Sequence, residues 1–177
     1  IIDSKDIFKR LSSYLKDVSP SQVNLVEYYR RKAPVFTSHE IEAQIEKSLQ
    51  RKVWLKSGGH LVLEHTEAMM VVDVNSGRFI GKRDHEQNSL KINLEAAREV
   101  GHQLRLRDIG GLIIIDFIDM REPANRKRVY NELVKELKHD RAKVVVSPIS
   151  EFGLLEMTRE RVRLSLLHSV SEECPTC

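Results

Sequence analysis

Two aspartates interrupt strands that are otherwise apolar. Asp73 follows the segment AMMVV, and Asp116 follows LIII. A carboxylate at such a position is costly to bury unless it is paired or bound to a metal. Asn75 lies two residues beyond Asp73, so strand alternation places both side chains on one face. The pattern offers an anionic oxygen ligand and a neutral amide that can orient it.

Carboxylates at the ends of buried strands suit magnesium, which keeps several waters and binds through a few anionic oxygens. The sequence has no histidine cluster at the spacing of a catalytic zinc site. We therefore interpret Asp73 and Asp116 as magnesium ligands for phosphoester hydrolysis, with Asn75 beside them. On the residues alone, a second interpretation stays open, in which both aspartates cap strands or accept backbone hydrogen bonds.

The CPTC motif at the end of the sequence is half of a possible zinc site. Cys174 and Cys177 are the two cysteines of the chain, and structural zinc takes four ligands. A second copy of the chain could supply the other two across a two-fold axis. The alternative is a thioredoxin-like redox pair, but such a pair is expected between a strand and a helix early in a fold. The terminal position favours a shared zinc.

The composition is that of an ordinary globular protein, with 41% hydrophobic and 31% charged residues in 177. No apolar run approaches the roughly 20 residues that cross a bilayer. The net charge of +3 does not by itself imply nucleic-acid binding. Residues 121–143 contain eight Lys/Arg against four Asp/Glu, which is also typical of a solvated helix face.

The ends and the cysteine usage give two further expectations. The sequence starts on Ile1 without a methionine and stops on Cys177, so we expect a piece of a longer protein. Two cysteines in one turn do not make a disulfide-stapled secreted fold, and no signal-peptide pattern is present. A cytoplasmic setting fits best.

Periodicity predicts the elements that position these residues. In the first part we expect a helix over 3–18, a short strand over 23–29, and a second helix with Ser38 as its N-cap. A hairpin over 53–65 turns at Ser57-Gly58-Gly59, and a strand over 68–74 is apolar enough to be buried on both faces. A polar stretch at 75–89 follows.

The later elements alternate between helix and strand. We expect helices over about 90–106 and 123–139, the second beginning at Pro123 and burying Val129, Leu133 and Leu137. Strands are expected over 112–118, 143–149 and 152–159. This order predicts an α/β fold with at least some parallel pairing.

Other acidic residues have simpler interpretations. Asp119 would face away from Asp116 in a regular strand, and we expect it to cap the following helix. Glu95 and Asp108 are interpreted as solvated helix residues. Glu64 and His65 stay undecided between support of the site and plain surface exposure.

Together these motifs closely resemble the bacterial and plastid ribonuclease E/G family. The similarity rests on SGGHLVLEHTEAM, VVDVNSGR, NLEAAREVGHQLRLRDIGGLIIIDFIDM, SPISEFGLLEMTR and CPTC, in that order, with PVFTSHEIEAQIE upstream. It implies a deoxyribonuclease-I-like mixed sheet with flanking helices at residues 49–170. Residues 1–48 would be the last part of an RNase-H-like subdomain, and residues 171–177 the zinc-link segment.

The resemblance also implies an activity. It implies magnesium-dependent endonucleolytic cleavage of single-stranded, A/U-rich RNA to 5′-phosphate and 3′-hydroxyl ends. Asp73 and Asp116 match the magnesium-binding aspartates, Asn75 the asparagine beside them, and Cys174 and Cys177 the zinc link between two protomers. We add four basic residues as possible phosphate contacts: Arg78, Lys82, Arg83 and Arg107.

The family's S1-type RNA-binding domain and 5′-end sensor, which come before the catalytic domain, are not in this sequence. The alternative hypothesis is therefore a zinc-linked homodimerisation or assembly fragment that is inactive without those domains. A higher oligomer is expected only of the full-length protein, in a bacterial cytoplasm or a plastid.

Overall fold

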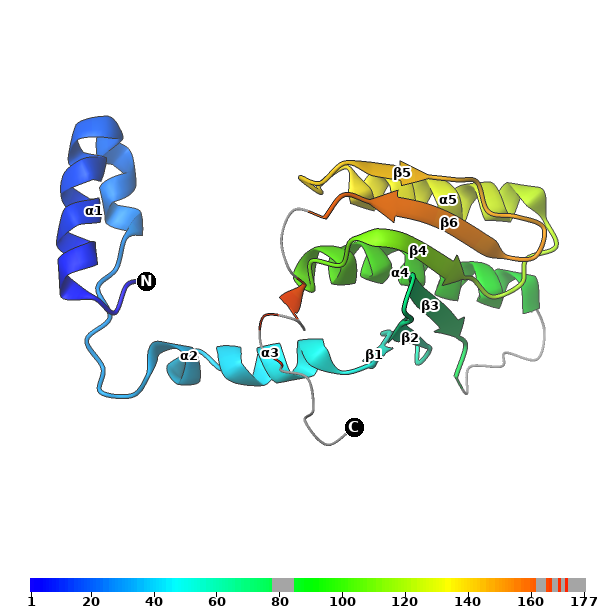
Figure 1. Cartoon of the computed structure of the whole chain (residues 1–177), viewed down its shortest axis with the longest axis horizontal. Helices are drawn as coiled ribbons and strands as arrows, with labels where there is room; N and C mark the ends of the chain where they lie inside the picture. Colours follow the sequence, from blue (N-terminus) through cyan, green and yellow to red (C-terminus); the bar gives the residue numbers. More distant parts are fainter. Residues whose placement is uncertain (78–84, 162–164, 167–168, 170, 172–177) are drawn as a thin grey trace. The chain divides into compact units, whose positions relative to one another are not determined.

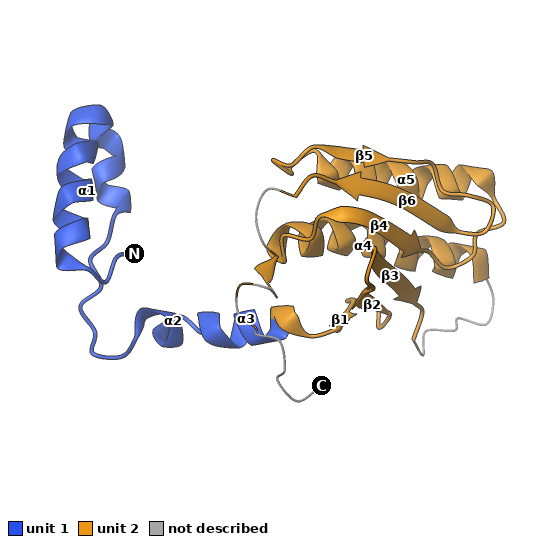
Figure 2. Cartoon of the chain, viewed as in Figure 1, with its two compact units in different colours: residues 1–47 blue, residues 48–177 orange. Residues whose placement is uncertain are grey.

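A computed structural model describes residues 1–77, 85–161, 165–166, 169 and 171 of the chain. The chain divides into two compact units, residues 1–47 and 48–177 (Figure 2). Asp73, Asn75 and Asp116 all belong to the second unit. Among the described helices, none is both long enough and apolar enough to cross a membrane.

The first unit is built from short helices. α1 (Lys5–Val18) begins after Ser4, whose hydroxyl accepts a hydrogen bond from the backbone N–H of Ile7. This confirms the first expected helix. α2 (Val35–Ser38) and α3 (Ile41–Leu49) follow, and α3 continues past the boundary between the units.

Two predictions for this unit are wrong. The strand expected over 23–29 is largely replaced by a 3-10 helix, η1 (Pro20–Leu25), because Pro20 has a fixed φ that suits a first helical turn. Within that described stretch, Tyr28 alone forms a β-bridge, with Ile2. Ser38 does not cap the second helix. It ends α2 and its hydroxyl is hydrogen-bonded to the Tyr29 hydroxyl.

The second unit contains a mixed sheet whose strand order is β1-β2-β3-β4-β6-β5 (Figure 1). β3 and β4 pair in parallel, and the other neighbours pair antiparallel. The parallel pair follows from a helical crossover, since parallel neighbours need a long connection. The α/β class, the 53–65 hairpin and the parallel pairing are confirmed. The strands are β1 (Lys52–Trp54), β2 (His60–His65), β3 (Met70–Asn75), β4 (Gly111–Asp116), β5 (Val144–Val146) and β6 (Leu154–Arg159).

Helices α4 (His85–Leu106) and α5 (Pro123–Leu137) lie together on one face of this sheet (Figure 1). The core lies between the two layers, and the predicted stripe of α5 is buried there. It is built from aliphatic side chains of both layers, among them Leu61, Val72, Ile113, Ile115 and Leu155 of the sheet and Ile92, Ala96, Val100, Leu104, Val129 and Leu133 of the helices.

Two further expectations need correction. α4 begins at His85, about one turn before the predicted start at Leu90. β3 is not buried on both faces, because α4 and α5 lie on the same face of the sheet. Val72 and Val74 point into the core, whereas Asp73 and Asn75 are half-buried on the other face.

Candidate metal centre

Asp73 and Asp116 lie opposite each other in the sheet. β3 and β4 run parallel with Asp73 in register with Asp116, so both side chains leave the same face at the carboxyl ends of their strands. Neighbouring strands are about 4.8 Å apart, which places the two carboxylates within reach of one ion. The carboxyl ends of parallel strands are where ligands bind in open α/β sheets.

Asn75 orients the first of these carboxylates. Its Nδ2 donates a hydrogen bond to Oδ2 of Asp73 at 2.7 Å. The amide fixes one oxygen of Asp73 and leaves the other available. The geometry is the one that the Asp-x-Asn spacing predicted, because strand alternation returns to the same face after two residues.

Asp119 is a third acid of the same group, and its predicted role was wrong. The N-cap of α5 is Glu122, not Asp119. β4 ends at Asp116, so strand alternation no longer decides where Asp119 points. Desolvation raises the pKa of Asp116, and the negative charges of Asp73 and Asp119 raise it further. Asp116 itself is exposed, so its surroundings desolvate it only in part.

This donor set fits magnesium. Among the described residues, no three His, Cys, Asp or Glu side chains gather closely enough to form an all-protein metal cage. Magnesium does not need one, because it is commonly bound through one or two carboxylates, several waters and substrate phosphates. No described Lys, Arg or His side chain forms an ion pair with Asp73 or Asp116. A divalent cation would neutralise their mutual repulsion.

Helix α4 braces the backbone that follows β4. Asn93 is fully buried, its Nδ2 donates to the Ile118 carbonyl at 2.7 Å, and its Oδ1 accepts from the Ile118 N–H at 3.1 Å. Ile118 lies two residues beyond Asp116, so Asn93 fixes the chain just past that carboxylate. A polar residue within the apolar stripe of a predicted helix was the only sequence signal for this role.

The same helix holds two other segments. The Glu95 carboxylate accepts hydrogen bonds from the backbone N–H groups of Lys56 and Ser57, in the turn between β1 and β2. Glu86 accepts from the N–H groups of Arg121 and Glu122 at the start of α5. The interpretation of Glu95 as a solvated helix residue is therefore wrong. Both contacts join segments far apart in the sequence, which periodicity cannot detect.

Close backbone approach positions the end of β3 against that turn. A side chain at Gly59 would place its Cβ 2.7 Å from the Asn75 carbonyl oxygen. Gly77 has a φ of +63°, and a Cβ there would collide with the Gly58 carbonyl. Glycine at 59 and 77 therefore lets the backbone around Asn75 pack directly on the β1–β2 turn.

His60 connects this region to the edge of the sheet. It is in register with Asn75 on one side and with Trp54 on the other. Burial and the charge of Lys52 lower the pKa of His60, and the charge of Asp73 opposes them. Lys52 and Asp73 therefore act on the same imidazole.

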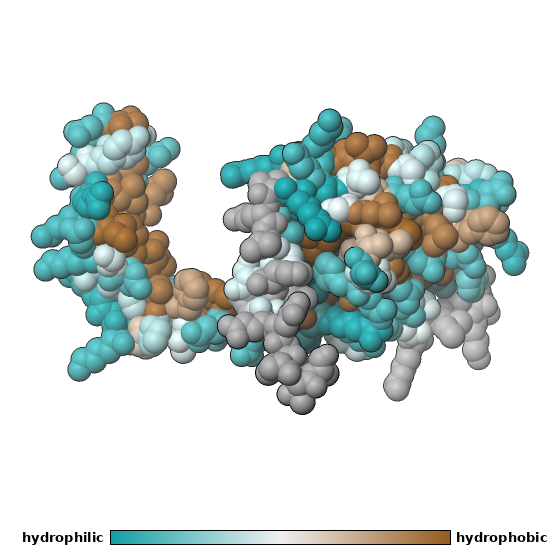
Figure 3. All heavy atoms as spheres, in the orientation of Figure 1, coloured by the Kyte–Doolittle hydropathy of each residue, from teal (hydrophilic) through white to brown (hydrophobic). Residues whose placement is uncertain are grey.

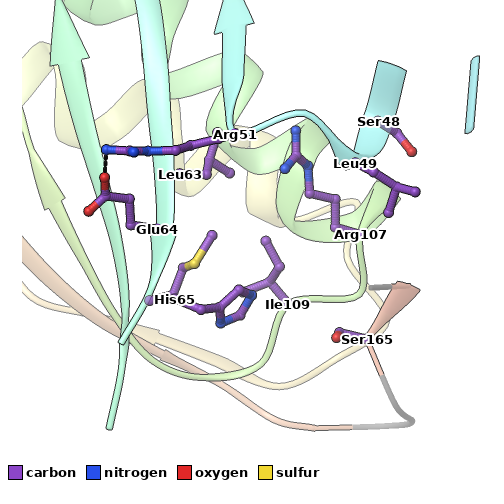
Figure 4. Close-up of a pocket in the computed structure, with 10 residues that line it drawn as sticks. Ser48, Leu49, Arg51, Leu63, Glu64, His65, Arg107, Ile109 and Ser165 are labelled. Atoms are coloured by element: carbon purple, nitrogen blue, oxygen red, sulfur yellow. Dashed lines mark ion pairs between the residues drawn. The ribbon is translucent and has the colours of Figure 1, made fainter. Parts of the chain in front are cut away.

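Arg107 is not brought to the aspartates. It is buried at the end of α4, where Nε donates to Gln103 Oε1 at 2.7 Å and Nη2 donates to the Gln50 carbonyl at 2.8 Å. It lines a cavity of about 430 Å³ beside Arg51, which is ion-paired to Glu64 (Figure 4). This cavity lies near the amino end of β3, away from Asp73.

Several predicted site residues lie outside the described residues. These are the phosphate-contact candidates Arg78, Lys82 and Arg83 and the zinc-ligand candidates Cys174 and Cys177. Their assignments stay predictions.

Comparison of the sequence with known proteins identifies a family for the chain. A sequence profile described as the ribonuclease E/G family matches residues 1–162. Ribonuclease G of Escherichia coli strain K12 is 42% identical over 176 residues, which cover 99% of this chain and 36% of that protein. Ribonuclease E of Haemophilus influenzae is 45% identical over 177 residues, covering 100% of this chain and 19% of that protein.

A plant relative gives the same result. The chloroplastic ribonuclease E/G-like protein of Arabidopsis thaliana is 42% identical over 179 residues, covering 100% of this chain and 18% of that protein. The chain therefore spans between 18% and 36% of the length of these curated relatives.

Proposed function

Because the chain belongs to the ribonuclease E/G family, we propose that it carries the magnesium-dependent cleavage centre of an endoribonuclease. The observation that carries the proposal is the register of Asp73 with Asp116 on adjacent parallel strands, with Asn75 bonded to the first carboxylate. The relatives' names, ribonuclease G and ribonuclease E, support RNA as the substrate.

The residues of the chain have separate roles in this mechanism. Asp73 and Asp116 would hold the ion, and the Asn75 amide orients the Asp73 carboxylate through its hydrogen bond to Oδ2. The raised pKa of Asp116 means that cation binding and proton release at this carboxyl are coupled. When bound, magnesium supplies polarisation of a phosphate oxygen and lowers the pKa of a bound water. Asp119 adds negative charge beside Asp116 and strengthens the attraction for a cation.

The substrate proposal is single-stranded, A/U-rich RNA cleaved to 5′-phosphate and 3′-hydroxyl ends, in RNA processing and decay. Arg78, Lys82 and Arg83 follow β3 directly in sequence and are proposed as phosphate contacts. Arg107 has the weakest support of the four, because its guanidinium is already bonded to Gln103 and Gln50.

The proposed assembly is a homodimer in which Cys174 and Cys177 of each copy share one structural zinc. The CPTC spacing supports it, since four thiolates complete the tetrahedral set that structural zinc requires. A longer protein could form a higher oligomer. The organisms of the relatives support a bacterial cytoplasm or a plastid as the location.

The test is the rate of cleavage of a labelled single-stranded A/U-rich oligonucleotide with and without magnesium. Asp73→Ala and Asp116→Ala should each lower the rate by about 10²- to 10³-fold, since the metal contribution amounts to several kcal/mol. Asp17→Ala, on the exposed surface of α1, is the matched control and should leave the rate unchanged. Cleavage by either site variant at the unsubstituted rate contradicts the assignment.

A further inference from the structure

Trp54 belongs to the same row of the sheet as Asn75. It is in register with His60, and His60 is in register with Asn75. In the next row, Lys52 is in register with Val62, Val62 with Asp73, and Asp73 with Asp116. Residues paired in register project from the same face, so Trp54 and Lys52 share the face of the carboxylates. Two strand spacings, about 10 Å, separate Trp54 from Asn75.

Trp54 presents a large aromatic surface to solvent. It is 65% exposed, on the edge strand β1. Two neighbours hold its ring. Lys52 Nζ lies 4.2 Å from the ring centroid, and the His60 ring centroid lies 5.2 Å away at an interplanar angle of 53°. Such contacts restrict the indole without covering it.

An exposed indole with a lysine against it has the chemistry of a single-stranded nucleic-acid site. Bases stack on aromatic rings, and nearby cations contact the phosphates that link them. Trp54 lies about 10 Å from Asn75. At that separation, a base stacked on Trp54 would belong to a nucleotide one or two positions away from the phosphodiester at the metal centre. Lys52 complements the negative charge of a phosphate on the face that also carries the two proposed magnesium ligands.

We propose that Trp54 and Lys52 form a base-stacking subsite that holds single-stranded RNA while an adjacent phosphodiester lies at Asp73 and Asp116. The position of that phosphodiester rests on the proposed function. The stacking itself does not, because it requires only the ring, the cation and a base.

The composition of the chain makes a direct test possible. Trp54 is the only tryptophan, so the intrinsic tryptophan fluorescence reports on this ring alone. The full chain is titrated without magnesium, so that no cleavage occurs, with a single-stranded oligouridylate and with an abasic oligonucleotide of equal length and charge. Stacking predicts quenching by the first and little quenching by the second.

Substitutions separate stacking from charge. By fluorescence anisotropy of a labelled oligouridylate, Trp54→Ala should weaken binding roughly 5- to 150-fold, and Trp54→Phe should retain most of the affinity. Phe36→Ala is the matched control, because Phe36 is 50% exposed and belongs to α2 in the first unit. Lys52→Gln should reduce the salt dependence of binding, whereas Lys127→Gln, on the exposed surface of α5, should not.

Three outcomes overturn the proposal. They are no quenching at the highest soluble oligonucleotide concentration, equal quenching by the abasic strand, and a fluorescence change that follows protein concentration without RNA. The last would mark Trp54 as a protein–protein contact.

Cleavage kinetics distinguish this proposal from the proposed function. Trp54→Ala should raise KM with a smaller effect on kcat, whereas Asp73→Ala should lower kcat by about 10²- to 10³-fold and leave the quenching intact. Quenching by RNA in a chain whose cleavage is insensitive to Asp73→Ala would support the stacking site and reject the metal centre.

Discussion

Charged side chains at the two ends of the sheet differ in whether they are paired with opposite charges. At the amino end of β4, Arg159 is 5% exposed, and it donates hydrogen bonds to Asp140 at 2.7 and 3.1 Å and to Asp108 at 3.0 Å. At the carboxyl ends of β3 and β4, Asp73 and Asp116 face each other with no described cation bonded to them. The charges at the first end are buried and paired with opposite charges. At the second end, charges of the same sign lie together and are partly exposed.

The difference contrasts a charge cluster that stabilises the fold with the end of the sheet at which we propose the cleavage centre. A buried charge persists in a fold only when it is paired and hydrogen-bonded. Arg159 meets that condition, because Asp108 and Asp140 of the same chain accept its hydrogen bonds. This pairing also corrects the interpretation of Asp108 as a solvated helix residue. At the aspartate end, Asp73 accepts a hydrogen bond from Asn75 but neither aspartate has a described cationic partner, and carboxylates gathered in this way are candidates for a functional site. Figure 3 shows hydrophilic residues over much of the visible surface of the chain, with hydrophobic residues among them.

Replacing Arg159, the cationic side chain of the paired end, should have the largest effect on stability. Arg159→Met removes the guanidinium that is hydrogen-bonded to Asp108 and Asp140, and we expect it to lower the free energy of unfolding by about 3–5 kcal/mol. Urea unfolding measures this. Arg98→Met, which breaks the more exposed Arg98–Glu132 pair, is the control and should lower it by no more than about 1 kcal/mol. A similar loss in both variants contradicts the proposed contrast.

The pH dependence of the same measurement sharpens the prediction. Burial raises the pKa of Asp140, but hydrogen bonds from Arg159 and from the Ala142 N–H outweigh it, so that the pKa is lowered overall. A lowered folded-state pKa stabilises the fold above the unfolded-state pKa, and this stabilisation is lost as pH falls through the folded-state value. Arg159→Met should therefore flatten the acid side of the stability profile.

Weakening the brace that holds the backbone beyond Asp116 should have an intermediate effect. Asn93→Ala leaves the Ile118 N–H and carbonyl without their partner, and we expect a loss of about 2 kcal/mol. Cleavage should also fall, because the backbone beyond Asp116 is no longer held. Asn131→Ala, on the exposed side of α5, is the control. Unchanged stability and unchanged cleavage in Asn93→Ala would show that the brace is dispensable.

Removing one charge from the unpaired end should have the smallest effect on the fold. Asp73→Asn removes a repulsion that helps to raise the pKa of Asp116, so that pKa should move down toward its ordinary value. A raised folded-state pKa destabilises the fold as pH rises through it, so Asp73→Asn should stabilise the protein slightly at neutral pH relative to acid pH. NMR titration of the Asp116 carboxyl measures the shift. Asp17→Asn should leave it unchanged.

The elements that sequence predicted well are those with strong local periodicity. The helix at Pro123, the hairpin through Gly58 and the apolar strand before Asp116 are confirmed. The strand over 23–29 was wrong because Pro20 favours a helical turn that continues to Leu25, and in the rest of that stretch Tyr28 alone forms a β-bridge. Ser38 failed as an N-cap because its hydroxyl is bonded to Tyr29, a contact across nine residues.

By itself, the sequence determined the family motifs, the pair Asp73 and Asn75 on one strand face, and the presence of Asp116 at the end of another strand. The tertiary structure decided that these strands are parallel neighbours, that Asp119 joins their charge and that Trp54 shares their face. It also decided that Asn93, Glu95 and Glu86 brace the surrounding segments. The physical reason is the range of the interactions. Periodicity records which way each residue faces along its own element, whereas strand pairing and buried hydrogen bonds join residues distant in the chain.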